Sequence, residues 1–196
     1  MSEVSVENQS WVVLDLETTN LVPAQSQILE CAVIHVRPED LAVLSASRWL
    51  VTHGTQGDMP PFVQQMHTTN GLLADLSEDR IFLSESGQLL ADAHSWFDTA
   101  LSAHFARINS ARHSIVLVGN SIHFDRSFLQ HHCPAACMYL HHRMIDVSCL
   151  RTLYKAWGGE LPVVASAHRA MPDCEASLQS LRWYARSVFR NDKVPA

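Results

Sequence analysis

Two carboxylates stand two residues apart near the start of the chain, in the segment Asp15-Leu16-Glu17. The apolar run from Trp11 to Asp15 predicts a buried strand, and side chains alternate along a strand, so Asp15 and Glu17 leave its end on one face. Two like charges about 4 Å apart cost roughly 4 kcal/mol at an effective dielectric of 20. A bound Mg²⁺ or Mn²⁺ removes that cost. Taken alone, an acid that caps the following turn is the simpler interpretation.

Two further groups of residues that could take part in catalysis or metal binding follow later in the chain. Asp125 stands between a predicted strand at 114–118 and a predicted helix at 125–132, where α/β sheets gather ligand groups. It could equally be the N-cap of that helix. His168 and Asp173 stand five residues apart at the start of the predicted last helix. There Asp173 could simply be a first-turn acid that the helix dipole favours.

Taken in chain order, these five residues form a recognisable constellation. They resemble the site of the DEDD exonucleases of the His subclass, which have a ribonuclease H-like fold. Four segments resemble oligoribonuclease in particular, and the resemblance extends over nearly the whole chain. These segments are Asp15-Leu-Glu-Thr-Thr-Asn-Leu21, Met66-His67-Thr-Thr-Asn-Gly-Leu72, Gly119-Asn-Ser-Ile-x-x-Asp125-Arg-x-Phe-Leu129 and Arg143-x-x-Asp146-Val-Ser148.

The resemblance implies a metal-dependent 3′–5′ exonuclease that hydrolyses very short oligonucleotides, down to dinucleotides, to 5′-mononucleotides. Two divalent cations, Mg²⁺ or Mn²⁺, would be bound by four carboxylates. His168 would accept the proton of the attacking water, a role that its near-neutral pKa suits. The four implied metal ligands are Asp15, Glu17, Asp125 and Asp173.

The resemblance also implies how a short substrate is held. Leu21 and Phe62 would wedge the bases, and a cap on the 5′ phosphate would impose the preference for short substrates. Family members are homodimers in which the region around His142 reaches toward the partner's site. The implied substrate-binding residues are Leu21, Phe62, His67, Ser121, His142, Arg143 and Ser148, of which Ser121, Arg143 and Ser148 form the cap.

Several residues depart from the family pattern near these expected substrate contacts. Thr18-Thr19-Asn20 replaces the usual Met-Thr-Gly, Phe62 stands where Trp is common, and His142 where Tyr is common. The metal-binding pattern is complete, so the chemistry is better defined than the substrate. No motif chooses between RNA and DNA dinucleotides, a choice that depends on one 2′-hydroxyl.

The elements that must position these residues follow an α/β order. Apolar runs predict a mixed sheet of about five strands, with a three-stranded antiparallel meander followed by parallel strands, covered on one side by helices. We expect residues 11–190 to form a single exonuclease domain, with a flexible N-terminus at 1–10 and a tail at 191–196. The predicted strands are 11–15, 28–36, 41–51, 114–118 and 144–145, and the predicted helices are 60–66, 84–109, 125–132, one starting near 146, and 172–189.

Composition excludes several classes of protein. The 196 residues are 47% hydrophobic, which supports a packed core, and the net charge of −6 argues against a broad basic surface for long nucleic acids. No apolar run is long enough for a membrane span, and the polar start is not a secretory signal. The five cysteines, an odd number, indicate reduced thiols and a cytoplasmic location.

Three alternatives remain open from the sequence. The first is a 3′–5′ exonuclease that trims longer single strands, against which the charge and the implied cap residues argue. The second is a non-catalytic nucleotide-binding protein, against which the complete set of acids and His168 argues. The third concerns a histidine- and cysteine-rich segment that could bind zinc, although its spacing matches no known finger and surface histidines are the simpler interpretation. That segment contains His131, His132, Cys133, Cys137, His141 and His142.

Overall fold

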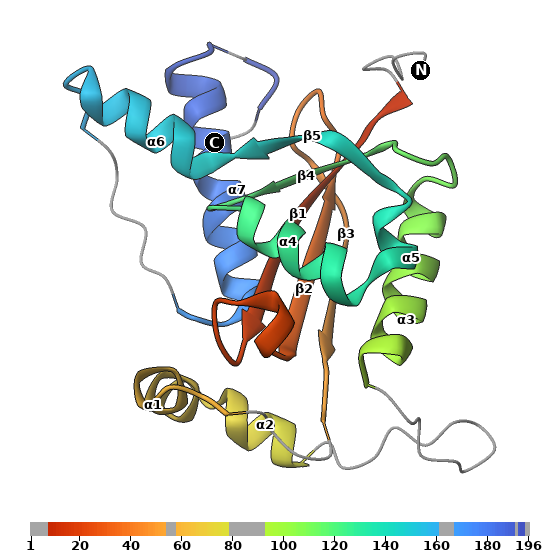
Figure 1. Ribbon diagram of the computed structural model, residues 1–196. Helices are drawn as coiled ribbons and strands as arrows, with labels where there is room; N and C mark the ends of the chain where they lie inside the picture. The colour runs from red at the N-terminus through yellow and green to blue at the C-terminus, as the bar shows by residue number, and fades with distance from the viewer. Residues whose placement is uncertain (1–7, 54–57, 79–92, 161–166, 191, 195–196) are drawn as a thin grey trace.

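A five-stranded mixed sheet forms the centre of the protein in a computed structural model, which describes residues 8–53, 58–78, 93–160, 167–190 and 192–194. The strand order is β3-β2-β1-β4-β5 (Figure 1). Strands β1 (Ser10–Thr18), β2 (Ile28–Val36) and β3 (Val43–Leu50) form the antiparallel meander, while β4 (Ile115–Gly119) and β5 (Leu140–Asp146) run parallel to β1. The predicted mixed sheet is thereby confirmed.

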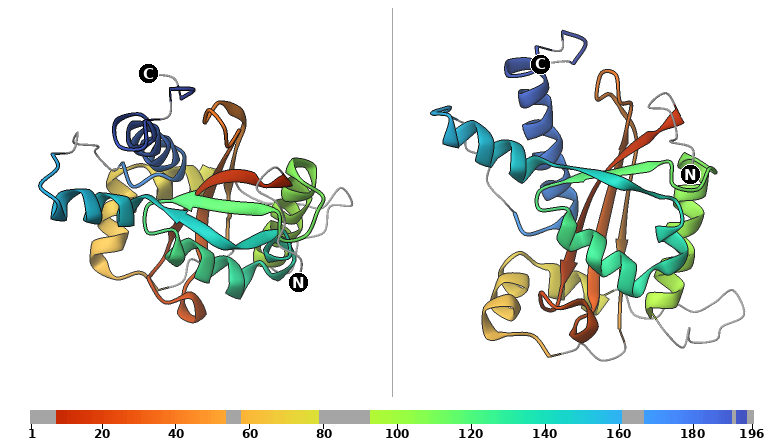
Figure 2. Two further views of the ribbon diagram at one scale, coloured as in Figure 1. Left: turned by 90° about the horizontal axis from the view of Figure 1, so that it is seen from above. Right: turned by 45° about the horizontal axis from the view of Figure 1, so that its top comes forward.

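Helices cover both faces of this sheet, so the expectation of a single covered face is wrong (Figure 2). On one face lie α3 (Ala93–Ile108), α4 (His123–His132) and α5 (Pro134–Cys137), and on the other α6 (Val147–Ala156) and α7 (Ala170–Ser187). The physical reason is the sequence of the central strands. Strands β2 and β4 are apolar at successive positions, so both of their faces require burial.

Two short helices complete the described part of the chain. Helices α1 (Pro61–Thr69) and α2 (Leu72–Glu78) lie beside one end of the sheet, and the 3₁₀ helix η2 (Pro23–Gln25) follows β1 (Figure 1). The structure has no helix among the described residues that is long and apolar enough to cross a membrane.

The pairing of β4 with β1 stops early and leaves an open strand edge. Only Ser10 to Val13 of β1 pair with β4, whereas β1 pairs with β2 as far as Thr18. The chain leaves the sheet at Gly119, where a Cβ atom would lie 2.8 Å from the carbonyl oxygen of Leu14. Only glycine permits this close approach. The second half of β1 is therefore free to meet α4, which follows the turn.

Several elements differ from their predicted limits. Strand β1 continues past Asp15 to Thr18 because its pairing with β2 continues, and β5 is longer than the predicted 144–145. Helices α2 and α5 were not predicted. Helix α5 depends on a distant acid, since Asp98 of α3 accepts hydrogen bonds from the backbone of Ala135 and Ala136. Of the helix predicted at 84–109, residues 84–92 lie outside the described part.

The proposed domain limits remain predictions. Strand β1 begins at Ser10, which we had placed in the N-terminal segment, and residues 1–7 lie outside the described part of the chain. Val194, which we had placed in the C-terminal tail, is buried in the cluster that packs α7 against the sheet.

Candidate active site

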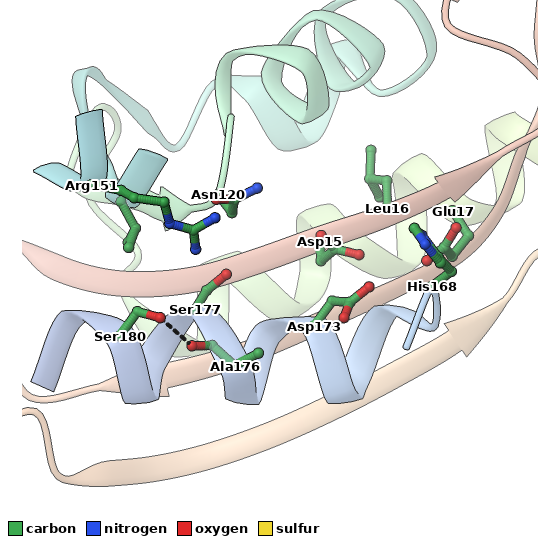
Figure 3. Close-up of a pocket in the computed structure, with 11 residues that line it drawn as sticks. Asp15, Leu16, Glu17, Asn120, Arg151, His168, Asp173, Ala176, Ser177 and Ser180 are labelled. Atoms are coloured by element: carbon green, nitrogen blue, oxygen red, sulfur yellow. Dashed lines mark hydrogen bonds between the residues drawn. The ribbon is translucent and has the colours of Figure 1, made fainter. Parts of the chain in front are cut away.

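Three carboxylates meet between β1 and α7. Asp15 and Glu17 project from the face of β1 that α7 covers, and Asp173 stands in the first turn of α7 (Figure 3). One oxygen of each carboxylate lies within 4.8 Å of the others. The alternation of side chains along β1 thus places Asp15 and Glu17 on one face, and the packing of α7 against that face adds Asp173. Oxygen ligands at this spacing suit a hard divalent cation.

Asp125 approaches the same strand from the other side. Helix α4 begins at His123, so Asp125 lies in its first turn and is not the N-cap. Its Oδ1 accepts a hydrogen bond of 2.9 Å from the backbone N–H of Leu16, at the edge of β1 that β4 leaves open. Asp125 is buried and does not belong to the group of three clustered oxygens.

His168 lines the cavity that the three carboxylates share. The cavity has a volume of about 310 Å³, and the His168 ring lies beside Glu17 at one end of it (Figure 3). His168 has a left-handed backbone conformation, with φ +51°, just before α7 begins. The structure therefore brings four of the five predicted catalytic residues to one cavity. The fifth, Asp125, lies at the adjacent edge of β1.

Burial and mutual repulsion raise the pKa values of Asp15, Glu17 and Asp125. Burial, followed by the charge of Asp173, raises the pKa of Glu17 to about 8. Burial and the charges of Asp125 and Glu17 raise the pKa of Asp15 well above its ordinary value. Burial also raises the pKa of Asp125 to about 7, although its hydrogen bond from Leu16 opposes this effect. A divalent cation would compensate this concentration of negative charge, so the donor set fits such an ion.

Because the pKa of Glu17 is raised in the folded protein, Glu17 should make the stability of the metal-free protein depend on pH. Between its ordinary pKa of 4.5 and about 8, the folded protein retains a proton that the unfolded chain has lost, so this group lowers the free energy of unfolding as the pH rises. In metal-free protein, Glu17→Gln should therefore stabilise relative to the native chain, and the difference in Tm should grow from about pH 5 to pH 8. A difference in Tm that shrinks over this range would contradict the assignment.

His67, which we expected to contact substrate, lies beneath the site instead. Its side chain is 0% exposed, its Nε2 lies 3.1 Å from the carbonyl oxygen of Thr18, and its Nδ1 lies 3.9 Å from Glu17 Oε2. Nδ1 makes no hydrogen bond with the described residues. A ring buried in this way contacts Glu17 from inside the protein and is not in a position to contact a ligand in the cavity.

The remaining predicted substrate residues do not line the cavity. Leu21 and Phe62 are 70% and 74% exposed, a large apolar exposure that suits the stacking of bases. Asp146, the N-cap of α6, links the two cap serines: it accepts hydrogen bonds from the backbone N–H of Ser121 and Ser148, each 2.9 Å, and from the Ser148 hydroxyl. The two serine hydroxyl oxygens are 3.5 Å apart. His142 and Arg143 are exposed on β5.

Some residues that line the cavity were not predicted from the sequence. Helix α7 presents Ala176, Ser177 and Ser180 on the same face as Asp173, and Arg151 of α6 lies toward the far end (Figure 3). Spacings of three, four and seven residues after Asp173 could have identified the α7 positions. Arg151 stands three residues after Ser148, one turn along α6, and Asn120 precedes Ser121 in a segment already singled out.

The histidine- and cysteine-rich segment does not form a metal site in the part of the chain that is described. Cys133 is buried in the core, and His132 Nε2 lies 2.9 Å from the carbonyl oxygen of Pro23. Among the described residues, the one group of three or more clustered ligand atoms is that of Asp15, Glu17 and Asp173, and it includes no residue of this segment. The described cysteines form no disulfide.

Comparison with known proteins identifies the family. A family model described as an exonuclease matches residues 12–181. The oligoribonuclease of Corynebacterium diphtheriae is 32% identical over 196 residues, covering 96% of this chain and 88% of the relative. The chain belongs to the oligoribonuclease family of exonucleases. The oligoribonuclease of Vibrio cholerae, 29% identical, covers 95% of this chain and is itself covered over 99% of its length.

Solved structures of other proteins share this fold. The zinc-bound form of E. coli exonuclease I with single-stranded DNA has a TM-score of 0.64 and 15% identity, covering 93% of this chain but only 42% of that protein. S. pombe Pop2p, in its Mg²⁺- and Mn²⁺-bound form, has a TM-score of 0.62 and 11% identity, covering 95% of this chain and 87% of that one. At these identities the likeness establishes the fold alone.

Proposed function

We propose that this exonuclease hydrolyses very short oligonucleotides, down to dinucleotides, from the 3′ end to 5′-mononucleotides. The observation that carries the proposal is the meeting of Asp15, Glu17 and Asp173 with His168 in one cavity. The oligoribonuclease relatives, matched over nearly their whole length, support the choice of short substrates. RNA and DNA dinucleotides both remain candidate substrates.

Each residue of the site has a proposed role in the hydrolysis. Asp15, Glu17 and Asp173, with Asp125, would hold two divalent cations, Mg²⁺ or Mn²⁺, which would polarise the phosphate and neutralise its charge. His168 accepts the proton of the water that attacks phosphorus. Asp125 bonds to the backbone of Leu16 and thereby fixes the strand segment between Asp15 and Glu17. His67 supports Glu17 from within the protein.

The other end of the substrate is held by a proposed phosphate cap. Asp146 holds Ser121 and Ser148 together, and their hydroxyl groups would bind a 5′ phosphate. To donate to the phosphate, the Ser148 hydroxyl would exchange its present hydrogen bond to Asp146. Arg143 would add a planar guanidinium, whose fork matches phosphate oxygens. Leu21 and Phe62 would support the bases. A cap at this end would leave space for two nucleotides and disfavour longer strands.

The cap predicts that binding is tightest for a 5′-phosphorylated dinucleotide and weakens as nucleotides are added. Removing the 5′ phosphate should weaken binding by about 10- to 150-fold, the effect of one charge-assisted hydrogen bond of roughly 1.5–3 kcal/mol. Arg143→Ala should cause a similar loss, and in that variant the phosphate should matter far less. Dissociation constants for strands of two to seven nucleotides, with and without the phosphate, measure these effects.

Two matched variants separate the cap from general electrostatic attraction. Arg112→Ala removes an exposed positive charge from a loop well before Arg143 in the chain. It should leave the phosphate effect unchanged. Arg151→Gln tests the cation that lines the cavity itself. If Arg151→Gln rather than Arg143→Ala removes the phosphate effect, the cap has been assigned to the wrong arginine. Equal affinity for two and seven nucleotides would favour an enzyme that trims longer strands.

A homodimer and a cytoplasmic location complete the proposal. Both were expected from the sequence, the first from the resemblance and the second from the unpaired cysteines. Sedimentation of the purified chain tests the dimer, and His142→Ala tests its contribution. In mixed dimers that combine His142→Ala with a subunit inactivated by Asp15→Asn, activity would be retained only if His142 acts in the partner's site.

A further inference from the structure

The turn that carries His168 is fixed by a charge network outside the cavity. Arg169, the next residue, is largely buried and donates from Nε and Nη2 to the two oxygens of Glu30, each at 3.2 Å. Glu30 is 1% exposed and also accepts a hydrogen bond of 2.9 Å from the backbone N–H of Ala170, where α7 begins. Arg169 also pairs with Asp75 of α2. Arg169 and Ala170 are thereby both hydrogen-bonded to β2 through Glu30.

A second set of contacts holds the His168 backbone itself. The side chain of Asn70, the C-cap of α1, donates from Nδ2 to the carbonyl oxygen of His168, while its Oδ1 accepts from the backbone N–H of Leu72. Arg169 Nη1 donates to the carbonyl oxygen of Asn70 at 3.1 Å. The left-handed conformation of His168 is uncommon for a residue with a Cβ and persists only where its surroundings hold it.

The network also accounts for a buried carboxylate that could compete for metal. Glu30 stands opposite Glu17 in the pairing of β1 with β2. Its oxygens are occupied by Arg48, Arg169 and the N–H of Ala170, and it does not belong to the clustered oxygens of the site. Two guanidinium groups thus face two carboxylates, Glu30 and Asp75, and the network is neutral as a whole.

We propose that Arg169 is a positioning residue for His168: its fork on Glu30 and its bond to Asn70 hold His168 in the backbone conformation that aims its ring into the cavity. The inference rests on the proposed function, in which His168 is the general base. It also connects the base to α1, because Asn70 ends the helix that carries Phe62.

The chain offers a closely matched control for a purely structural role. Arg48 of β3 pairs with the same two carboxylates, Glu30 and Asp75, but in the described structure it forms no hydrogen bond or ion pair with residues 167–170. Arg169→Gln should lower kcat by about 10- to 100-fold, the usual cost of losing a partner that orients a reacting group. Because Arg169 does not line the cavity, KM should change by less than about threefold. Arg48→Gln should lower kcat by less than about threefold, even if its Tm falls as much as that of Arg169→Gln.

A double-mutant cycle with His168→Ala is the deciding experiment, with a 5′-phosphorylated dinucleotide and saturating Mn²⁺. If Arg169 acts through His168, Arg169→Gln should change kcat by no more than about twofold in the His168→Ala background. An equal loss in both backgrounds, or an equal loss in Arg48→Gln, overturns the positioning role. An undiminished kcat in His168→Ala instead overturns the proposed base.

Two further measurements keep the experiment informative if Arg169→Gln folds poorly. Arg169→Lys keeps the charge but loses the planar fork, so its kcat should lie between those of the native chain and Arg169→Gln. Stabilisation by Mn²⁺, measured as the shift in Tm, should be retained in Arg169→Lys because the three clustered carboxylates are intact. A native kcat in Arg169→Lys would contradict the requirement for the fork.

Discussion

Replacing Asp15 or Asp173 by asparagine should abolish turnover while leaving the fold intact. Each substitution removes one of three carboxylates whose oxygens lie within 4.8 Å of one another. Each also relieves repulsion among the acids, which adds to burial in raising the pKa of Asp15 well above its ordinary value. The Tm of the metal-free protein should therefore hold or rise, whereas the increase in Tm caused by Mn²⁺ should shrink.

A matched substitution on the same helix controls for the change in charge. Glu175→Gln removes one negative charge from α7 two residues beyond Asp173, on an exposed side of the helix. It should retain normal turnover and a normal Mn²⁺ shift. Near-normal, metal-dependent turnover in Asp15→Asn would show that the two-metal assignment is wrong.

Loss of His168 should have the second-largest effect. His168→Ala should lower kcat by about 10²- to 10⁴-fold, the usual consequence of losing a general base. Stabilisation by Mn²⁺ should survive, because His168 lies beside the carboxylates but is not assigned as a ligand. In the native protein the rate should rise with pH as the general base loses its proton, and this rise should be lost in the variant.

His131→Ala is the natural comparison for this result. His131 is exposed on α4, and its substitution should leave both the rate and the pH profile unchanged. If the profile of His168→Ala keeps the native rise, another group accepts the proton, and the role of His168 would have to be reassigned.

Much of the sheet could be predicted because local patterns encode it, whereas the set of candidate metal ligands, Asp173 among them, came from the family resemblance. Alternation along β1 places Asp15 and Glu17 on one face, and the apolar run at 28–36 predicts β2 with its observed limits. Composition and short-range periodicity are sufficient for such features.

The features that were missed depend on contacts between distant parts of the chain. The burial of His67 follows from the packing of α1 against β1, and α5 depends on Asp98, 37 and 38 residues earlier in the chain. The network around Arg169 joins Glu30, Arg48, Asn70 and Asp75, which share no local pattern. Coverage of both faces of the sheet could have been expected, since β4 is apolar at successive positions.

Hydrolysis of a 5′-phosphorylated dinucleotide in ¹⁸O-labelled water is the most direct test of the central claim. The account predicts mononucleotides as products only when Mn²⁺ or Mg²⁺ is present. One ¹⁸O should be found in the 5′ phosphate of the nucleotide released from the 3′ end, and no product should form with Asp15→Asn. Cleavage that continues in the presence of a chelator, label in a 3′ phosphate, or turnover by Asp15→Asn would contradict it.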